Sequence, residues 1–213
     1  MRTFTIDPLE LRRPDLLVDL FPFTTWNPFC KYFLGTDEHY RLLSHLSWQL
    51  ERGETVVDVG TFLGFSALAL SHNQTARVIS YDISQSIPAT SDSFTPLHRA
   101  TIDFRLGDVL KDLPSLLHAP LMFLDTNHDG TFEREFIQEL QRLKYQGIVL
   151  CDDINLNDEM RAFWADVSLP KIDLTSVGHW SGTGAILFDP SVTRLQLLDQ
   201  GLRALEEAVE TQC

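Results

Sequence analysis

The chain has 213 residues and a formal net charge of −13, from 17 basic and 30 acidic side chains. This length suits one α/β domain and leaves no room for a second domain of ordinary size. Nucleic acid and anionic membranes are not expected as partners, because both repel an acidic surface and no run of Lys or Arg offsets the charge.

The cysteines and the hydropathy of the chain indicate in which cellular compartment the protein is expected. Cys30, Cys151 and Cys213 are odd in number and far apart, which supports neither a disulfide framework nor a zinc site. The amino-terminal residues lack the apolar core of a signal peptide, and no apolar run is long enough to span a bilayer. We therefore expect a cytoplasmic protein; whether it forms a homo-oligomer stays open.

Residues 1–37 differ in composition from the rest of the chain. They contain four prolines and several aromatic side chains, among them Trp26. This composition predicts an irregular segment. It either packs on the outside of the domain or forms a lid over a substrate pocket, and packing is favoured because aromatic side chains are readily buried. Residues 38–213 are assigned to the domain itself.

Strands and helices alternate from residue 38 onward. Five short apolar or β-branched runs predict strands, namely 55–59, 77–82, 102–106, 121–125 and 147–152. Apolar residues at helical spacing predict helices between them. Such alternation predicts parallel strands joined by right-handed crossovers. Two further runs, 171–178 and 184–189, flank a short Gly/Ser/Thr turn and predict a terminal hairpin.

The first strand-to-helix turn is a candidate ligand site. Gly60 and Gly64 bracket it, where free helix N–H groups are available and a side chain would block a ligand. Dinucleotide folds prefer G-x-G-x-x-G at this turn, but Phe62 stands in place of the middle glycine, which disfavours a nicotinamide-dependent oxidoreductase. Asp82 follows roughly 20 residues later, where the ribose hydroxyls of an adenosine lie in this architecture.

The segment VVDVGTFLGFSALAL, followed by Asp82 and then by Leu106-Gly107-Asp108, resembles the successive motifs of class I S-adenosylmethionine-dependent methyltransferases. The resemblance implies a Rossmann-like, doubly wound α/β fold, with a mostly parallel seven-stranded sheet, an antiparallel terminal strand and helices on both faces. It also implies a set of cofactor-binding residues: Asp58, Gly60, Thr61, Gly64 and Ser66 at the methionine end, Asp82 at the ribose and Asp108 at the adenine edge.

Some of these residues have a simpler interpretation. Asp58 could serve only a turn or a helix dipole, and Asp108 could merely cap the helix that follows it, as acidic residues commonly do. The ordered set of motifs, rather than any one of them, favours the cofactor.

Two successive strands end in acidic residues, Asp125 in one and Asp152 with Asp153 in the other. Neighbouring strands lie about 4.8 Å apart, and ligands bind beyond their carboxyl ends, so these carboxylates can converge. Three converging carboxylates repel each other unless a cation neutralises them, and oxygen ligands suit Mg²⁺ or a similar divalent ion. Alternatively, only one or two face the site and the others cap helices.

His128 is the candidate general base, because it lies beside the proposed ion and an imidazole titrates near neutral pH. Five other histidines are interpreted as ordinary ones without a catalytic role: His39, His45, His72, His98 and His118. Trp180 lies in the turn of the predicted hairpin, where it either walls an acceptor pocket or packs back on the sheet.

The D-x-x-H sequence from Asp125 to His128, followed by the acidic pair, resembles metal-dependent O-methyltransferases of the catechol type and of the macrolide-sugar, or mycinamicin, type, over roughly residues 38–190. Catechol enzymes have lysine where His128 stands and asparagine where Asp153 stands, so the chain is more similar to the second type. The resemblance implies S-adenosylmethionine-dependent, Mg²⁺-assisted transfer to a hydroxyl of a small molecule, which could be a natural product, a sugar or a phenol. Two alternatives stay open: a metal-independent methyltransferase, and a non-catalytic S-adenosylmethionine-binding module.

Overall fold

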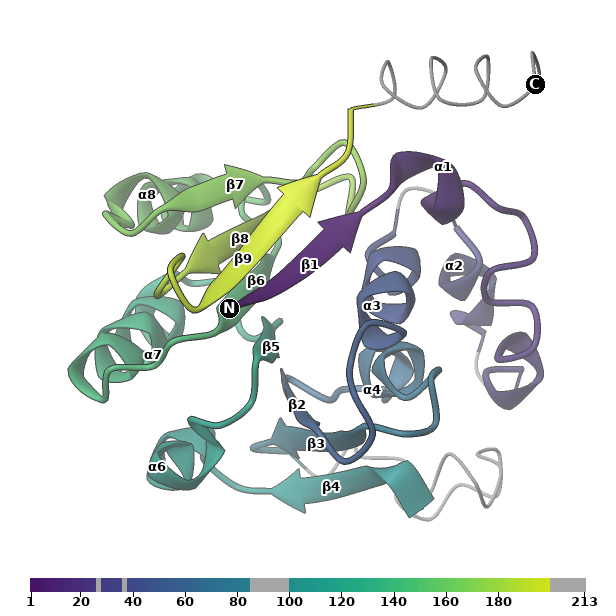
Figure 1. The fold of residues 1–213 in the computed structure, drawn as a ribbon, viewed down its shortest axis with the longest axis horizontal. Coiled ribbons are helices and arrows are strands. Elements are labelled where there is room, and N and C mark those ends of the chain that lie inside the picture. The colour runs from purple at the N-terminus through teal and green to yellow at the C-terminus, as the bar shows by residue number, and fades with distance from the viewer. Residues whose placement is uncertain (26–27, 36–37, 85–99, 200–213) are drawn as a thin grey trace.

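A seven-stranded sheet forms the centre of the computed structural model, which describes residues 1–25, 28–35, 38–84 and 100–199 (Figure 1). Its strand order is β4-β3-β2-β5-β6-β8-β7. Every neighbouring pair is parallel except the two pairs made by β8, which runs antiparallel to β6 and β7. The predicted fold class is confirmed. The strands are β2 (Thr55–Val59), β3 (Arg77–Asp82), β4 (Ile102–Leu106), β5 (Leu121–Leu124), β6 (Ile148–Asp152), β7 (Lys171–Asp173) and β8 (Thr183–Leu187).

Helices cover both faces of this sheet, so its central strands are buried and read as continuous apolar runs (Figure 1). Side chains alternate between two hydrophobic clusters: Phe123 and Leu150 belong to one, Met122 and Val149 to the other. One face carries α3 (Tyr40–Ser47) and α4 (Phe65–Leu70). The other face carries η2 (Val109–Lys111), α6 (Leu113–Leu116), α7 (Thr131–Arg142) and α8 (Asp158–Asp166).

The amino-terminal segment contains regular elements where the sequence predicted an irregular one. β1 (Arg2–Ile6) pairs in parallel with β9 (Thr193–Leu197) in a separate two-stranded sheet, which contacts α3, β6 and β8. Short helices follow, namely α1 (Pro8–Leu11), η1 (Phe21–Phe23) and α2 (Cys30–Phe33). β1 escaped prediction because a five-residue strand shows too few alternations, and its partner lies at the other end of the described chain. The boundary at residue 37 stays a prediction.

The predicted terminal hairpin exists as β7 and β8, but residues 174–182 make a longer connection than the short turn expected. This connection is bound to the residues that follow β6: Ile154 donates its N–H to the carbonyl of Gly182, and Asn155 donates to that of Ser181. It therefore lies over the carboxyl end of the sheet, and so do the side chains that it carries.

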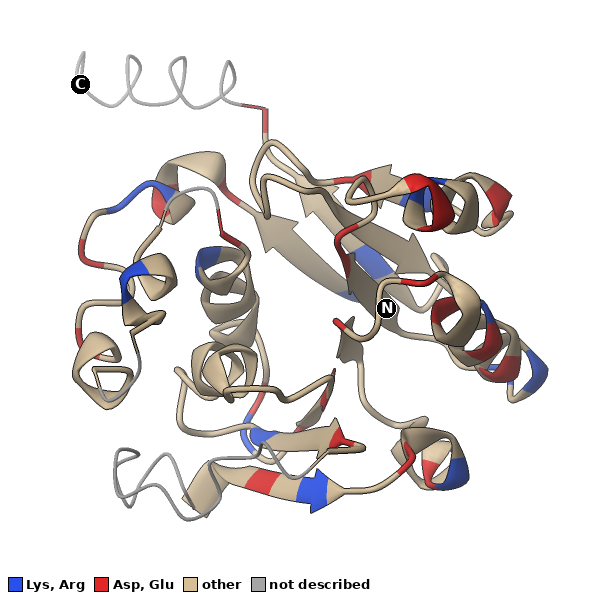
Figure 2. Ribbon diagram, turned by 180° about the vertical axis from the view of Figure 1, so that it is seen from behind, with Lys and Arg blue, Asp and Glu red and all other residues tan. Residues whose placement is uncertain are grey.

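Two surface-related features of the described residues are the distribution of charge and the hydropathy of the helices. Figure 2 shows Lys and Arg scattered among the more numerous acidic residues rather than gathered on one element. None of the helices in the described ranges has the length and apolar character needed to cross a bilayer.

The ends of β2 and β5 approach each other closely at Gly60. A Cβ atom at this position would lie 1.6 Å from the carbonyl oxygen of Asp125, and the backbone φ of Gly60 is +101°. Both the close approach and the left-handed backbone require glycine. Gly60 therefore joins the glycine loop to the loop that carries Asp125, whatever ligand lies above them.

We expect Gly60→Ala to lower the free energy of unfolding by about 3 kcal/mol or more, because the methyl group meets backbone that cannot yield. Gly53→Ala is the matched control, since Gly53 also has a positive φ of +84° but open space around its Cβ position; it should cost only about 1 kcal/mol. Urea unfolding measures both. Equal losses would show that the contact with Asp125 is not the constraint.

Candidate active site

A cavity of about 700 Å³ lies at the carboxyl ends of β2, β3, β4 and β5. We call it the large cavity. Its lining includes five of the residues predicted from the sequence: Gly60, Asp82, Asp108, Asp125 and His128. The motifs that are spread over the chain therefore meet at one edge of the sheet, as the parallel topology requires.

Asp82 binds the glycine loop as well as facing the large cavity. Its Oδ2 accepts the N–H of Phe62 at 2.8 Å, and its Oδ1 accepts the N–H of Ser84 at 2.7 Å. Phe62 itself has a φ of +41°, so the position where dinucleotide folds place a glycine does adopt a left-handed backbone. Asp108 caps η2 by accepting the N–H of Leu110 at 3.0 Å, so it is both a cap and a cavity residue.

The residues expected at the methionine end divide into two groups. Thr61 and Ser66 line a second cavity, whereas Asp58 and Gly64 are not among the described residues that line either one. Gly64, with φ +78°, is the N-cap of α4. Asp58 is fully buried and accepts a hydrogen bond from Ser80, whose hydroxyl also contacts Thr61. Burial raises the pKa of Asp58 to about 7, against the opposing hydrogen bonds from Ser80 and Ser66.

The second, small cavity has a volume of about 390 Å³ and shares Gly60, Phe62 and Asp125 with the large one. Aromatic side chains from separate segments line it. Phe29 and Tyr32 come from the amino-terminal segment, and Trp180 comes from the connection between β7 and β8. The amino-terminal segment therefore forms part of the cavity wall. The lid role predicted for it stays a prediction, and Trp26 lies outside the described residues.

The loop after β5 places Asp125 and His128 side by side. His128 Nε2 lies 2.9 Å from Asp125 Oδ1 and 3.2 Å from Asp153 Oδ2. The backbone N–H of His128 donates to the buried Glu133, and its carbonyl accepts from Asn157 at the start of α8. Because these bonds hold its backbone at a φ of +58°, the imidazole is directed at both carboxylates.

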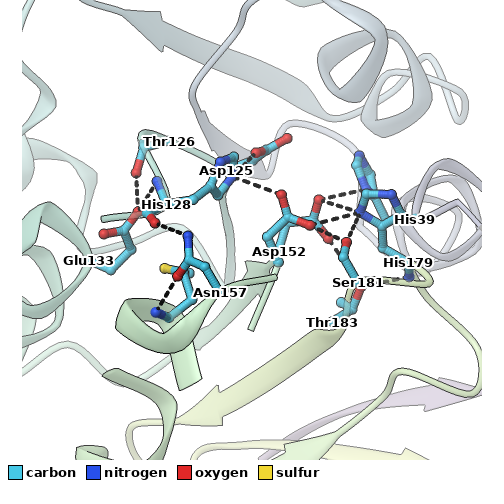
Figure 3. Close-up of polar contacts among 12 residues, drawn as sticks. His39, Asp125, Thr126, His128, Glu133, Asp152, Asn157, His179, Ser181 and Thr183 are labelled. Carbon is cyan, nitrogen blue, oxygen red and sulfur yellow. Dashed lines mark hydrogen bonds and ion pairs between the residues drawn. The ribbon is translucent and has the colours of Figure 1, made fainter. Parts of the chain in front are cut away.

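His179 and His39, which the sequence indicated as an ordinary histidine, also belong to this cluster. His39 Nδ1 lies 3.0 Å from Asp152 Oδ2, and His179 Nδ1 lies 3.0 Å from the same oxygen. In Figure 3, His39 and His179 approach Asp152 from one side, and Asp125 and His128 lie on the other. No motif in the sequence marks His39 or His179. Only the packing of α3 and of the β7–β8 connection brings them to the end of β6.

The predicted carboxylate triad is not a single all-oxygen group. In the described part of the chain, four trios place one possible metal-ligand atom of each member within 4.8 Å of the others, and every trio contains a histidine. The trio of Asp125, Asp152 and Asp153 is not among them. The cluster can thus hold a divalent ion, but with nitrogen as well as oxygen ligands.

The charges within the cluster shift the ionisation of its members. Burial opposes charging of His128 and His179, but hydrogen bonds and charges from the aspartates outweigh it and raise their pKa values to about 9 and about 10. Burial alone would raise the pKa of Asp152, yet His39 and His179 lower it. The carboxylates therefore act as a strong negative site that draws in cations, either protons on the imidazoles or a metal ion.

Residues 57–154 match the family model of a methyltransferase domain, a stretch that begins in β2 and ends just after β6. The match covers 98 of the 213 residues, so this stretch is similar to a methyltransferase domain. The sheet around it has the Rossmann-like fold of methyltransferases. No curated protein matches the chain.

Solved structures resemble this chain at low identity. The SAH-bound methyltransferase PaMTH1 of Podospora anserina has a TM-score of 0.57 at 20% identity, over 82% of this chain and 88% of that one. Cofactor-bound Rv0187 from MTB has a TM-score of 0.53 at 19% identity, over 82% and 96%. A putative caffeoyl-CoA O-methyltransferase from Staphylococcus aureus has a TM-score of 0.50 at 13% identity, over 63% and 75%. At these identities the likeness shows the fold alone.

We expect Asp58 to make the stability of the protein depend on pH. Its folded-state pKa of about 7 exceeds the ordinary value of 3.8. Between these values the folded state holds a proton that the unfolded chain has released, so the free energy of unfolding falls as pH rises from about 4 to about 7. We expect Asp58→Asn to remove this loss, about 1.4 kcal/mol for each pH unit between the two pKa values. Chemical unfolding of both proteins at pH 5 and pH 8 measures it; a difference that does not grow with pH contradicts the assignment.

Proposed function

We propose that the chain transfers the methyl group of S-adenosylmethionine to a hydroxyl of a small molecule, with a divalent ion held in the cluster of aspartates and histidines. One observation carries this proposal: the large cavity and the small cavity share Gly60, Phe62 and Asp125. A cofactor in one cavity and an acceptor in the other would meet beside Asp125, where methyl transfer needs its two reactants in contact.

The large cavity suits the nucleoside end of the cofactor. Asp82 is the last residue of β3, at the place where ribose hydroxyls bind in doubly wound folds. Its Oδ2 has a lone pair left beside the contact with Phe62. Asp108 and the apolar side chains of Val109, Leu110 and Phe132 line the same cavity and would surround an adenine. The SAH-bound Podospora structure of the same fold supports this choice of ligand.

The small cavity suits the acceptor. The aromatic faces of Phe29, Tyr32 and Trp180 favour a small organic molecule over a polymer. Asp125 also lines this cavity, so the polar end of such a molecule would lie on the side of the cluster. A bound divalent ion would lower the pKa of an acceptor hydroxyl and favour the oxyanion that attacks the methyl group.

His128 is the proposed base for the hydroxyl proton. Asp125 and Asp153 raise the pKa of His128 to about 9, which favours the protonated imidazole. Additional positive charge among the aspartates would lower this pKa and let Nε2 accept a proton. The acceptor oxygen would then form a bond to the methyl carbon while the carbon–sulfur bond breaks, leaving S-adenosylhomocysteine as a neutral thioether. Asp125 and Asp153 would hold the imidazolium that results.

We expect Asp82→Asn to weaken binding of S-adenosylhomocysteine by about 10-fold or more, because a charged acceptor for ribose hydroxyls contributes roughly 1.5–3 kcal/mol. Asp103→Asn is the matched control: Asp103 lies on the adjacent strand β4, pairs with Arg77 and Arg105, and is not among the described residues lining the large cavity. Isothermal titration calorimetry measures both affinities. The cofactor site is wrong if both variants bind as tightly as the wild type.

We expect His128→Ala to slow methyl transfer by about 10²–10⁴-fold, the usual contribution of a positioned general base, with little change in S-adenosylhomocysteine affinity. Single-turnover transfer of a labelled methyl group to a panel of phenols and sugars provides the rate, and His118→Ala serves as the control. A normal rate of methyl transfer in His128→Ala would contradict the role of His128 as general base. If no acceptor in the panel is methylated while the cofactor binds, a non-catalytic binding module becomes the better description.

A further inference from the structure

His39 occupies a buried position that its sequence surroundings did not reveal. It is the N-cap residue of α3, and only 3% of its surface is exposed. Its ring packs between Phe123 of β5 and Tyr40, with centroid separations of 4.9 Å and 4.4 Å. These contacts fix the imidazole in place and exclude it from bulk water.

The ring nitrogens of His39 have an ion-pair contact with Asp152 but no hydrogen bond to a described residue. Among the described residues neither Nδ1 nor Nε2 makes a hydrogen bond, although Nδ1 lies 3.0 Å from Asp152 Oδ2. The two atoms are close without being aligned as donor and acceptor. Two ligands of one ion show such a relationship, because atoms each about 2.1 Å from a metal and at right angles lie about 3.0 Å apart. Buried polar atoms that make no hydrogen bond call for an explanation of this kind.

His39 forms one of the possible ligand trios with Asp125 and Asp152. Asp153, which the sequence predicted as the third ligand, has other partners. Its Oδ1 accepts the hydroxyl of Ser181, and its Oδ2 contacts His128 at 3.2 Å. His39 therefore takes the place in the ligand set that Asp153 leaves.

His179 orients this set from outside. Its Nδ1 contacts Asp152 Oδ2 at 3.0 Å, and its Nε2 contacts Glu38 Oε2 at 3.3 Å. A histidine held by a second carboxylate in this way fixes the direction of the ligating carboxylate, as outer partners of metal ligands generally do.

We propose that His39, Asp125 and Asp152 hold the divalent ion. With a histidine among its ligands, the ion is a first-row transition metal such as Mn²⁺, Fe²⁺, Co²⁺ or Zn²⁺ rather than Mg²⁺. This inference rests on the proposed metal-assisted function. Mg²⁺ takes oxygen ligands almost exclusively, whereas an imidazole favours the transition ions. The affinity of such a site rises from Mn²⁺ through Fe²⁺ and Co²⁺ to Cu²⁺ and falls again at Zn²⁺.

Metal binding without catalysis tests the proposal. The chelator-treated protein is titrated with Co²⁺ and with Mg²⁺ by calorimetry, and the visible spectrum of the Co²⁺ form is recorded to detect nitrogen ligation. We expect Co²⁺ to bind at least about 100-fold more tightly than Mg²⁺. His39→Asn, which offers an amide oxygen in place of the imidazole, should weaken Co²⁺ binding by at least about 10-fold, alter the Co²⁺ spectrum and reduce the preference over Mg²⁺.

Further variants separate the possible failures. Asp125→Asn should also weaken Co²⁺ binding, and His118→Asn, outside the cluster, should not.

Unchanged Co²⁺ binding in His39→Asn together with loss in Asp125→Asn overturns the role of His39 but keeps the metal site of the proposed function. Loss in His179→Asn with full retention in Asp125→Asn moves the ion to Glu38, His39 and His179 and overturns the proposed ligand set. No binding of either ion to the wild type overturns this inference and the metal step, while S-adenosylhomocysteine binding still tests the cofactor site independently.

Discussion

The contact between Gly60 and the backbone of Asp125 sets the geometry on which the site depends. A glycine with a positive φ lets the loop after β2 lie directly against the loop after β5. Both loops border the large cavity, and the second also carries Asp125 and His128 of the cluster of carboxylates and histidines. Because the approach is made by backbone atoms, the separation between these two regions does not depend on side-chain rotamers. Reactants positioned by such a framework need little further ordering to meet.

Buried charge is the second constraint. Glu38, Asp125, Asp152 and Asp153 converge with three histidines at one edge of the sheet, and each imidazole lies within about ion-pair distance of a carboxylate. Isolated carboxylates in this setting would take up protons, so the histidines compensate them when no ion is bound. Protons on the imidazoles or a metal ion can therefore offset much of the negative charge of the cluster. Binding of an ion would therefore change the protonation of His128.

The elements that complete the site come from both ends of the described chain. β1 and β9 pair beside α3, whose N-cap residue is His39, and the segment between β1 and α3 supplies Phe29 and Tyr32 to the small cavity. The connection between β7 and β8 supplies Trp180 and His179 from the opposite side. The parallel core thus provides the glycine loop and the aspartates, and the additions to the core line the small cavity with aromatic side chains.

The sequence by itself determined the core of this protein. Alternating strand and helix patterns predicted a parallel sheet, and the resemblance to class I methyltransferase motifs implied its Rossmann-like fold class. The acidic strand ends then indicated the edge at which Asp82, Asp108 and Asp125 meet, because parallel strands place their carboxyl ends together. Tertiary structure alone decided the pairing of β1 with β9 and the arrival of His39 and His179 at Asp152. Those contacts join segments far apart in the chain, and their positions follow from how α3 and the β7–β8 connection pack on the sheet. Local periodicity and spacing carry no information about such packing.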